Sequence, residues 1–455
     1  MKSTNPITGT TVWDGEAASA DAVKAAVATA RAAFHHYALT SLSDRIAMME
    51  RWGEAILARK EEIARAISDE IGKPMWEART EAGAMAGKVA HSIRAQAERA
   101  GANQSDAMAL DHRPHGVMAV FGPFNFPGHL PNGHIIPALL AGNTIVFKPS
   151  ELAPSLGDIF AQIGRDAGLP DGVLNIVQGG SDTGAALLNA DIDGLLFTGS
   201  AGTGTFFHKH FAGRPNVILA LEMGGNNPLI IHDAVDVDAA ADIAAVSAFI
   251  SAGQRCSCAR RLILPTGTFG DAVLDKIAAK IAAMTIGAPD EDVFISSVVS
   301  EEAAKAAIAF EADLTKRGGR SIVALDRNGA YLRPGLMDVT GVDAPDEEIF
   351  APFLQVVRVD GIDAQIAAAN DTRFGLAAGL VSDDAALWDY TRPRLRAGIV
   401  NWNKPTTGAA SSMAFGGPGL SGNFRPGAYY AADYCAWPQA SQTATTPVSP
   451  ALPNF

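Results

Sequence analysis

The stretch Gly194-Leu195-Leu196-Phe197-Thr198-Gly199-Ser200-Ala201-Gly202-Thr203-Gly204 joins a short apolar run to a glycine-rich turn. The apolar part suits a fully buried parallel strand, and the following residues, Thr205–Phe211, suit a helix. Glycines and small hydroxyls at the start of a helix expose backbone N–H groups, which bind the pyrophosphate of a dinucleotide. Such a turn alone is a weak indication of dinucleotide binding, so the fold and the ligand must be inferred from the sequence around it.

The same alternation of short apolar runs and helical segments continues on both sides of this stretch. Further buried strands are expected at Val117–Phe121, Thr144–Phe147, Val173–Val177 and Val217–Leu221, with helices at Leu156–Gly168 and Thr183–Leu188. A second alternating block has strands expected at Leu229–Ile231, Leu262–Leu264 and Val356–Val359. Strands that alternate with helices form parallel sheets with right-handed crossovers. The sequence therefore predicts an α/β fold with a doubly wound, Rossmann-type sheet.

The first hundred residues are predicted to be helical. The segment Asp21–Ala33 is rich in alanine. From Ser43 onward, apolar residues recur mostly at three- or four-residue steps, which predicts one helix with a buried stripe up to Gly72-Lys73-Pro74. A further helix is expected over Trp76–Ala97.

Length and charge restrict the class of protein. A chain of 455 residues predicts two or three folding units. The 36 basic and 49 acidic residues give a formal charge of −13, without the basic footprint of a nucleic-acid-binding protein. The longest apolar runs are too short for a membrane span. Because three cysteines are too few for a disulfide framework and no leader is evident, we expect a cytoplasmic protein.

The hexapeptide Gly253-Gln254-Arg255-Cys256-Ser257-Cys258 holds a candidate nucleophile. A cysteine attacks as the thiolate, so it needs a site that favours ionisation. The alternative is that Cys256 is a packed core residue, which is the more common use of an isolated cysteine. Metal binding is not expected, because no second Cys/His pair stands at ligand spacing.

Two other segments end predicted strands with polar side chains. Glu222, in Leu221-Glu222-Met223-Gly224-Gly225, is a candidate general base or, alternatively, a cap for the following turn. Asn125, in Phe121-Gly122-Pro123-Phe124-Asn125-Phe126-Pro127, is a candidate oxyanion donor or the residue of an Asx turn.

Lys148 and Glu151 follow another predicted strand, in Phe147-Lys148-Pro149-Ser150-Glu151. They lie on the same rim as the glycine-rich turn if the strands are parallel. A carboxylate there accepts hydrogen bonds from ribose hydroxyls and repels a 2′-phosphate, which favours NAD over NADP. The alternative is a solvated pair at the edge of the sheet.

Taken together and in this order, these segments resemble the aldehyde dehydrogenase superfamily from about Asn5 to the C-terminal region. The resemblance implies that an aldehyde is oxidised through a thioester on Cys256, with Glu222 as the base and Asn125 as the oxyanion donor. It implies NAD binding by Lys148, Glu151, Gly199, Ser200, Gly202 and Gly204, and by Glu348 at the nicotinamide ribose. The implied domains are NAD-binding (1–103 and 117–223), catalytic (224–424) and oligomerisation (104–116 and 425–455), in a homodimer or homotetramer.

Other segments resemble the members of the family that act on N-succinyl-L-glutamate 5-semialdehyde in arginine catabolism. These segments are Phe126–His134, Glu222–Pro228, Arg255–Arg261, Asn401–Pro405 and Tyr429–Pro438. They imply an acidic small-molecule substrate, with His129, Arg255, Asn403 and Arg425 as candidate contacts. Arg260 and Arg261 either contribute to this selection or pair with surface acids or another subunit.

Two alternatives and two departures accompany this resemblance. The substrate could instead be succinate semialdehyde or glutamate semialdehyde. The protein could also be a catalytically inactive dinucleotide-binding or structural protein, but the presence of Cys256, Glu222 and Asn125 disfavours this alternative. Ala351 stands where the family usually has glycine. We also expect the short strand that usually precedes Asn5 to be missing.

Overall fold

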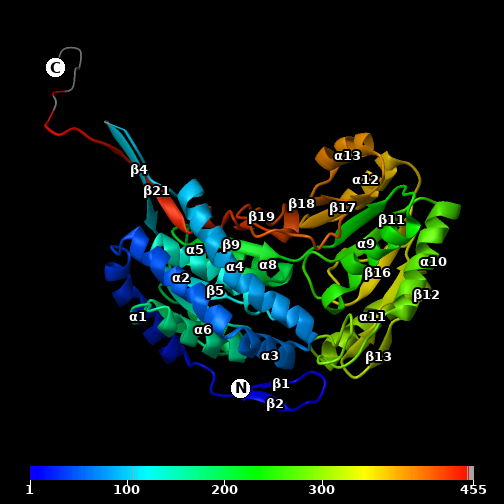
Figure 1. Ribbon diagram of the computed structural model, residues 1–455, viewed down its shortest axis with the longest axis horizontal. Coiled ribbons are helices and arrows are strands. Elements are labelled where there is room, and N and C mark those ends of the chain that lie inside the picture. Colours follow the sequence, from blue (N-terminus) through cyan, green and yellow to red (C-terminus); the bar gives the residue numbers. More distant parts are fainter. Residues whose placement is uncertain (106, 448, 450–455) are drawn as a thin grey trace.

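Two sheets lie side by side and form the centre of the computed structural model, which describes residues 1–105, 107–447 and 449 (Figure 1). The first sheet contains five parallel strands in the order β7-β6-β5-β8-β9. Their bounds are β7 (Leu174–Ile176), β6 (Thr144–Lys148), β5 (Val117–Phe121), β8 (Gly194–Gly199) and β9 (Ile218–Met223). The parallel Rossmann-type sheet predicted from the sequence is confirmed.

Both faces of the first sheet are covered by helices, as parallel sheets require. One core cluster unites one face with α2 (Leu42–Ala58), α3 (Lys60–Ile71), α4 (Met75–Arg99), α5 (His129–Ala141) and α6 (Pro154–Asp166). The other face packs on α1 (Ala20–Tyr37), α7 (Ser181–Leu188) and α8 (Ala201–His210). Successive residues of β5 alternate between the two clusters, because side chains of a strand point to opposite faces.

The second sheet has the order β12-β15-β16-β11-β10-β17-β18 and is parallel except at the β12–β15 edge. Its strands are β12 (Arg320–Val323), β15 (Gly335–Asp338), β16 (Phe353–Arg358), β11 (Ala259–Leu264), β10 (Asn227–Ile231), β17 (Ala377–Val381) and β18 (Ile399–Trp402). The helices around it are α9 (Val237–Phe249), α10 (Thr268–Ala283), α11 (Glu301–Lys316), α12 (Ile362–Asn370) and α13 (Ala385–Thr391).

The two sheets are joined end to end by a short segment. The carboxyl end of β9 leads through Gly224, Gly225 and Asn226 to the amino end of β10. Open α/β sheets bind ligands outside the carboxyl ends of their strands. The space between the sheets therefore holds the carboxyl ends of the first sheet and the amino ends of β10 and β11.

The single helix predicted from Ser43 to Gly72 is wrong. The structure divides it into α2 and α3 at Arg59, whose backbone (φ −104°, ψ 15°) leaves the helical region. The apolar stripe runs through both helices, since Ile56 and Ile63 are both fully buried, and so the periodicity gave no sign of the break. Within the described residues, no helix combines the length and the apolar composition that a bilayer crossing requires.

The strand expected to be missing before Asn5 is present. β1 (Lys2–Thr4) pairs with β2 (Thr11–Asp14) in an antiparallel ribbon. Asn5 closes the connecting turn, because its Oδ1 accepts hydrogen bonds from the amides of Ile7 and Thr8. Three residues before the turn are thus enough to form the ribbon.

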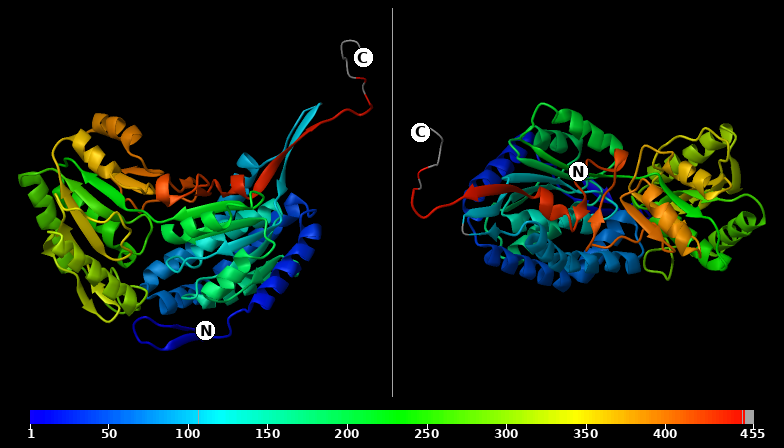
Figure 2. Two further views of the ribbon diagram at one scale, coloured as in Figure 1. Left: turned by 180° about the vertical axis from the view of Figure 1, so that it is seen from behind. Right: turned by 90° about the horizontal axis from the view of Figure 1, so that it is seen from above.

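A three-stranded arm extends away from the two sheets (Figures 1 and 2). Its order is β21 (Ala436–Gln442), β4 (Met108–Pro114) and β3 (Asn103–Gln104). The arm includes most of the predicted oligomerisation segment 104–116 and the part of 425–455 that begins at Ala436. Ala431, Tyr434 and Cys435 of that second segment instead belong to the first core cluster, and residues 106, 448 and 450–455 lie outside the described residues. The predicted domain bounds and their roles stay predictions.

Candidate functional site

The loop after β5 places Asn125 against the cysteine loop. The Asn125 Nδ2 donates a hydrogen bond of 3.0 Å to the backbone oxygen of Gln254, and the side chain is buried. This partner lies 129 positions away in the sequence, whereas the side chain of an Asx turn bonds its own local backbone. An amide nitrogen carries two hydrogens, so the second one remains for a ligand.

The segment before Cys256 has an unusual backbone. Ser251, Ala252 and Gly253 have φ values of 57°, 50° and 72°, in the left-handed region that non-glycine residues rarely adopt. A Cβ atom at Gly253 would lie 2.1 Å from the backbone oxygen of Ala351, so glycine is required there. Ala351, which stands where the family usually has glycine, is therefore buried against this turn. Its carbonyl also accepts a hydrogen bond from Arg260.

Asn227, the first residue of β10, fixes the cysteine loop from the other side. Its Nδ2 donates to the backbone oxygens of Cys256 (2.7 Å) and Cys258 (2.8 Å). Its Oδ1 accepts from the amide of Ala377 on β17. The side chain thus fixes the position of the cysteine relative to the amino ends of β10 and β17.

Glu222 lies on β9, with a buried carboxylate that has one strong partner. Its Oε1 accepts a hydrogen bond of 2.7 Å from the Gly427 amide, which rules out the predicted alternative of a cap on the following turn. Its Oε2 has no partner among the described residues. Burial raises the pKa of Glu222 well above its ordinary value, opposed by the Gly427 hydrogen bond and by the ammonium of Lys88.

Cys256 and Glu222 line one cavity of about 290 Å³ between the two sheets. Burial and the carboxylates of Glu348 and Glu222 raise the pKa of the Cys256 thiol, while Arg260 opposes this shift. The thiol is therefore the resting form, and a base is needed for attack. The cavity is also lined by α4, α5 and the β19 (Ala414–Phe415) and β20 (Gly427–Ala428) hairpin. The candidate nucleophile and base thus share one space, and Asn125 contacts the backbone two residues before the cysteine.

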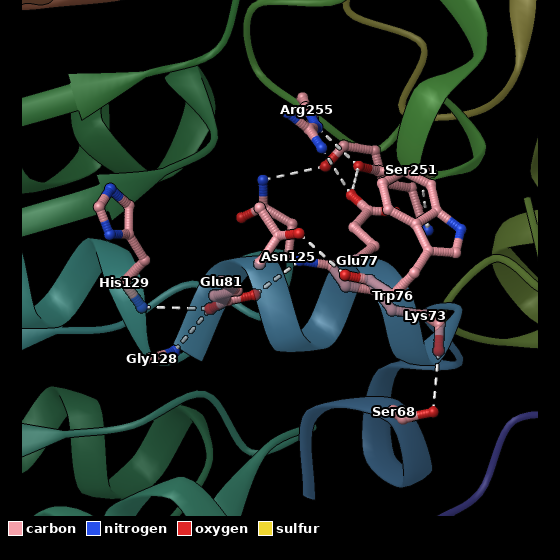
Figure 3. Close-up of polar contacts among 12 residues, drawn as sticks. Ser68, Lys73, Trp76, Glu77, Glu81, Asn125, Gly128, His129, Ser251 and Arg255 are labelled. Atoms are coloured by element: carbon pink, nitrogen blue, oxygen red, sulfur yellow. Dashed lines mark hydrogen bonds and ion pairs between the residues drawn. The ribbon is translucent and has the colours of Figure 1, made fainter. Parts of the chain in front are cut away.

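Helix α4 contributes two buried carboxylates, one turn apart, that fix the loops of the cavity (Figure 3). Glu77 accepts hydrogen bonds from Ser251 and, at 2.7 Å, from Arg255. Glu81 accepts from the amides of Gly128 (3.0 Å) and His129 (3.1 Å), at the start of α5. Both loops that carry candidate catalytic residues are therefore attached to α4.

The candidate coenzyme residues lie at the carboxyl ends of β6 and β8. Lys148 is buried, and its Nζ lies 3.4 Å from Glu151 Oε2; the Glu151 side chain is 56% exposed. Ser200 is the N-cap of α8, with its Oγ accepting from the Thr203 amide. A Cβ atom at Gly204 would lie 2.1 Å from the sulfur of Met223, so this glycine lets α8 pack on β9.

The residues of this rim fit a dinucleotide. A Cβ atom at Gly202 would meet little, since the nearest atom is Ser200 Oγ at 3.9 Å, and so the backbone at the start of α8 is accessible. Glu348 lies beside the segment that joins β9 to β10, where its Oε1 accepts a hydrogen bond of 3.1 Å from the Gly225 amide. Burial raises the pKa of Glu348 to about 7, against the opposing effect of Arg260.

The four candidate substrate residues divide into two pairs. His129 and Arg255 line the cavity, although the guanidinium of Arg255 is already paired with Glu77. Asn403 and Arg425 do not line it. Asn403 uses both ends of its amide on the backbone of Ser382, and Arg425 is exposed.

Arg260 and Arg261 have neither of the two expected roles. Arg260 is fully buried and donates to the backbone oxygens of Arg255 and Ala351. Arg261 is also buried and donates to four backbone oxygens, those of Asn226, Ala368, Ala369 and Asp371. Arg260 therefore bonds loop carbonyls around the cysteine segment, and Arg261 bonds Asn226 and the carbonyls at the C-terminal end of α12.

A family model described as "Aldehyde dehydrogenase family" matches residues 1–439. The chain belongs to the aldehyde dehydrogenase family. A relative from Burkholderia mallei (strain SAVP1), named N-succinylglutamate 5-semialdehyde dehydrogenase, is 54% identical over 450 residues, which cover 96% of this aldehyde dehydrogenase and 92% of the relative.

Two solved structures illustrate the likeness of fold. The NAD-dependent aldehyde dehydrogenase from Sinorhizobium meliloti has a TM-score of 0.93 and 29% identity, over 99% of this chain and 92% of that chain. The glyceraldehyde-3-phosphate dehydrogenase GapN from Methanocaldococcus jannaschii, a complex with NADP, has a TM-score of 0.91 and 25% identity, over 97% and 98% of the two chains. Similar folds in the family therefore carry either coenzyme.

Sequence reasoning missed the contribution of α4 to the site of this aldehyde dehydrogenase. Glu77, Glu81 and Lys88 are spaced by four and seven residues, so they share one face of the helix, and all three line the cavity. Charged residues at this spacing usually mark a solvated face. The sequence carries no signal that distinguishes them from such a face.

Replacing Gly253 by Ala is expected to lower turnover by about a hundredfold or more. The new Cβ would meet the Ala351 carbonyl, and the resulting displacement of Cys256 by even about 1 Å costs this much in rate. Steady-state kinetics would measure the effect. Gly180→Ala is the matched control, since nothing lies within 4 Å of its Cβ position. Near-wild-type turnover in Gly253→Ala would show that the turn does not position the cysteine.

Proposed function

We propose that this aldehyde dehydrogenase oxidises N-succinyl-L-glutamate 5-semialdehyde, or a closely similar acidic semialdehyde, to the carboxylate with NAD. The observation that carries the chemistry is the convergence of Cys256 and Glu222 on one cavity, with Asn125 bonded beside the cysteine. The 54% identity to the Burkholderia mallei relative, over nearly the whole of both chains, supports the choice of substrate.

The first step is attack of the Cys256 sulfur on the aldehyde carbon. The thiol proton passes to solvent water, and the carbonyl oxygen becomes an alkoxide as the C–S bond forms. The free N–H of the Asn125 amide and the Cys256 backbone N–H stabilise this alkoxide, and one such donor contributes about 3 to 4 kcal/mol to the transition state. A dinucleotide held by the Gly199–Gly204 segment and Glu348 would supply the hydride acceptor, and loss of hydride from the tetrahedral carbon would leave a thioester on Cys256.

The second step is hydrolysis of the thioester. The unpaired Oε2 of Glu222 suits the role of general base, because it can accept a proton from water as the water oxygen attacks the thioester carbon. The C–S bond then breaks, and the sulfur leaves as thiolate. The Gly427 amide holds the other oxygen of Glu222 and so orients the carboxylate.

Lys148, Glu151 and the segment Gly199–Gly204 are proposed to bind the dinucleotide, with Glu348 at the nicotinamide ribose. The accessible α8 N-terminus suits the pyrophosphate. The exposed Glu151 carboxylate suits the ribose hydroxyls and repels a 2′-phosphate, which supports NAD as the preferred coenzyme.

The oligomer is proposed to be a homodimer or homotetramer that forms through the arm. β21 lies at the edge of the three-stranded sheet, so one side of its backbone can pair with another chain. This assignment agrees with the predicted oligomerisation segments at 104–116 and 425–455.

Cys256→Ala is expected to abolish NADH formation, because no carbon–sulfur bond can form. Glu222→Gln should keep the pre-steady-state burst of NADH while steady turnover falls by about a hundredfold or more, since only the base for hydrolysis is lost. Stopped-flow measurement of NADH absorbance would resolve both phases. If Cys256→Ala makes NADH at the wild-type rate, or if Glu222→Gln loses the burst, these roles are wrong.

Glu151→Gln is expected to lower the preference for NAD over NADP by at least about tenfold, because one like-charge repulsion near the protein surface is removed. The ratio of kcat/KM for the two coenzymes measures this preference. Glu302→Gln, an exposed acid on α11, controls for the change in net charge. An unchanged ratio would remove Glu151 from coenzyme selection.

Among N-succinyl-L-glutamate 5-semialdehyde, succinate semialdehyde and hexanal, the first is expected to give the highest kcat/KM in an NAD-reduction assay. It has the most groups that a selective cavity can bind. A preference for succinate semialdehyde would support the alternative substrate class. A preference for hexanal would contradict an acidic substrate, while aldehyde oxidation itself would stand.

A further inference from the structure

The charged groups that line the cavity differ in whether their charges are already balanced. Glu77 binds Arg255 at 2.7 Å, and Glu81 binds Lys73 at 2.7 Å, so each of these charges has a fixed opposite partner. His129 and His134 also line the cavity, and burial lowers the pKa of each to about 3, which keeps both neutral at pH 7. None of these groups offers an unbalanced positive charge.

Lys88 is the exception among the described residues of the cavity. It projects from α4, is 5% exposed, and lines the same cavity as Cys256 and Glu222. Within the part of the chain that the structure describes, the one hydrogen bond of its ammonium runs 3.4 Å to the neutral hydroxyl of Ser411. An ammonium carries three donors, so most of its hydrogen-bonding capacity is unused.

Helix α5 makes room for this side chain. A Cβ atom at Gly133 would lie 3.0 Å from Lys88 Cε and 3.5 Å from its Nζ, and so the glycine allows the lysine to lie flat against α5. The site is therefore shaped to keep the ammonium inside the cavity. Among the described residues no carboxylate lies within ion-pair distance of the Lys88 ammonium. Burial, which is costly for a charge, lowers the pKa of Lys88 to about 8, although the more distant carboxylate of Glu222 acts in the opposite direction.

We propose that the Lys88 ammonium binds a carboxylate of the substrate and thereby selects acidic semialdehydes over neutral aldehydes. This inference rests on the proposed function. A substrate carboxylate supplies a counterion at contact distance and accepts charge-assisted hydrogen bonds from the ammonium. Arg255 is a weaker candidate, because Glu77 already holds its guanidinium.

The test compares kcat/KM for N-succinyl-L-glutamate 5-semialdehyde with kcat/KM for hexanal, in the wild type, Lys88→Met and Lys88→Arg. The ratio of the two values is the readout, because an effect on folding, on Cys256 or on Glu222 affects both substrates alike. Lys88→Met should lower the ratio by about tenfold to a hundredfold, the usual contribution of a charged hydrogen bond. Lys88→Arg should retain most of the wild-type ratio.

Ser411→Ala is the matched control, since it removes the neutral partner of Lys88 but leaves the charge; its ratio should stay near that of the wild type. Gly133→Ala should lower the ratio less than Lys88→Met does, because the new Cβ meets Lys88 Cε at 3.0 Å and shifts the side chain only slightly. If the wild type prefers the acidic substrate and Lys88→Met keeps the full preference, this inference is wrong while the proposed function stands. If the wild type prefers hexanal, the proposed substrate itself fails. An equal fall for both substrates in Lys88→Met would overturn selection and assign Lys88 to the support of Glu222.

The pH profile gives a second readout. The groups whose charges interact with Lys88 are Glu222 on β9, His129 and His134 on α5, and His91 on its own helix. Lys88 loses its charge as pH rises through about 8, so the wild-type ratio should fall between about pH 7 and pH 9. In Lys88→Arg the ratio should stay level, because a guanidinium remains charged. A level ratio in the wild type would contradict the proposal.

Discussion

The buried pair of Glu81 and Lys73 is the contact on which the geometry of the site depends. One oxygen of Glu81 lies 2.7 Å from the ammonium, while the other accepts the first two amides of the α5 region, from Gly128 and His129. Removing one partner of a buried pair typically costs about 3 to 5 kcal/mol. Here the same carboxylate also fixes where α5 begins, and with it the loop that presents Asn125. An electrostatic contact at α4 thus determines the position of the candidate oxyanion donor.

Helix α4 also couples the two sheets. At its start, the Met75 amide donates to the Pro289 carbonyl, and the Trp76 indole donates to the Val293 carbonyl, both in the second half of the chain. The next residue, Glu77, binds Arg255 and Ser251. The helix therefore packs within the first core cluster but holds the cysteine loop of the second sheet. Fixed ion pairs build the walls of the cavity, and the unbalanced ammonium of Lys88 remains for recognition.

Most of the first sheet could be predicted from the sequence, because its strands are short, fully apolar and separated by helical segments. Val117–Phe121 is a strand with the predicted bounds, and both faces are buried as expected. The division at Arg59 could not be predicted, since the apolar stripe continues across it. The choice of Cys256, Glu222 and Asn125 relied on a resemblance to a family. The structure places Cys256 and Glu222 on one cavity and Asn125 against the backbone of Gln254, and their roles stay predictions. Lys88 escaped notice because it lies far from them in the sequence and because a lone lysine on a helix is ordinarily solvated. Asn403 was named for its place in a motif, whereas its amide bonds the backbone of Ser382 and so joins the ends of β17 and β18.

The left-handed turn at Ser251, Ala252 and Gly253 has a consequence for the order in which heat damages the protein. Left-handed conformations at non-glycine residues cost of order 1 to 3 kcal/mol each and persist only where the surroundings enforce them. The enforcing groups, Glu77 and the carbonyl of Ala351, come from opposite sides of the boundary between the sheets. A slight loosening of that boundary releases the turn to a relaxed backbone while each sheet keeps its own core. We therefore expect the Cys256 sulfur to lose its position on mild warming, so that inactivation precedes the melting of secondary structure.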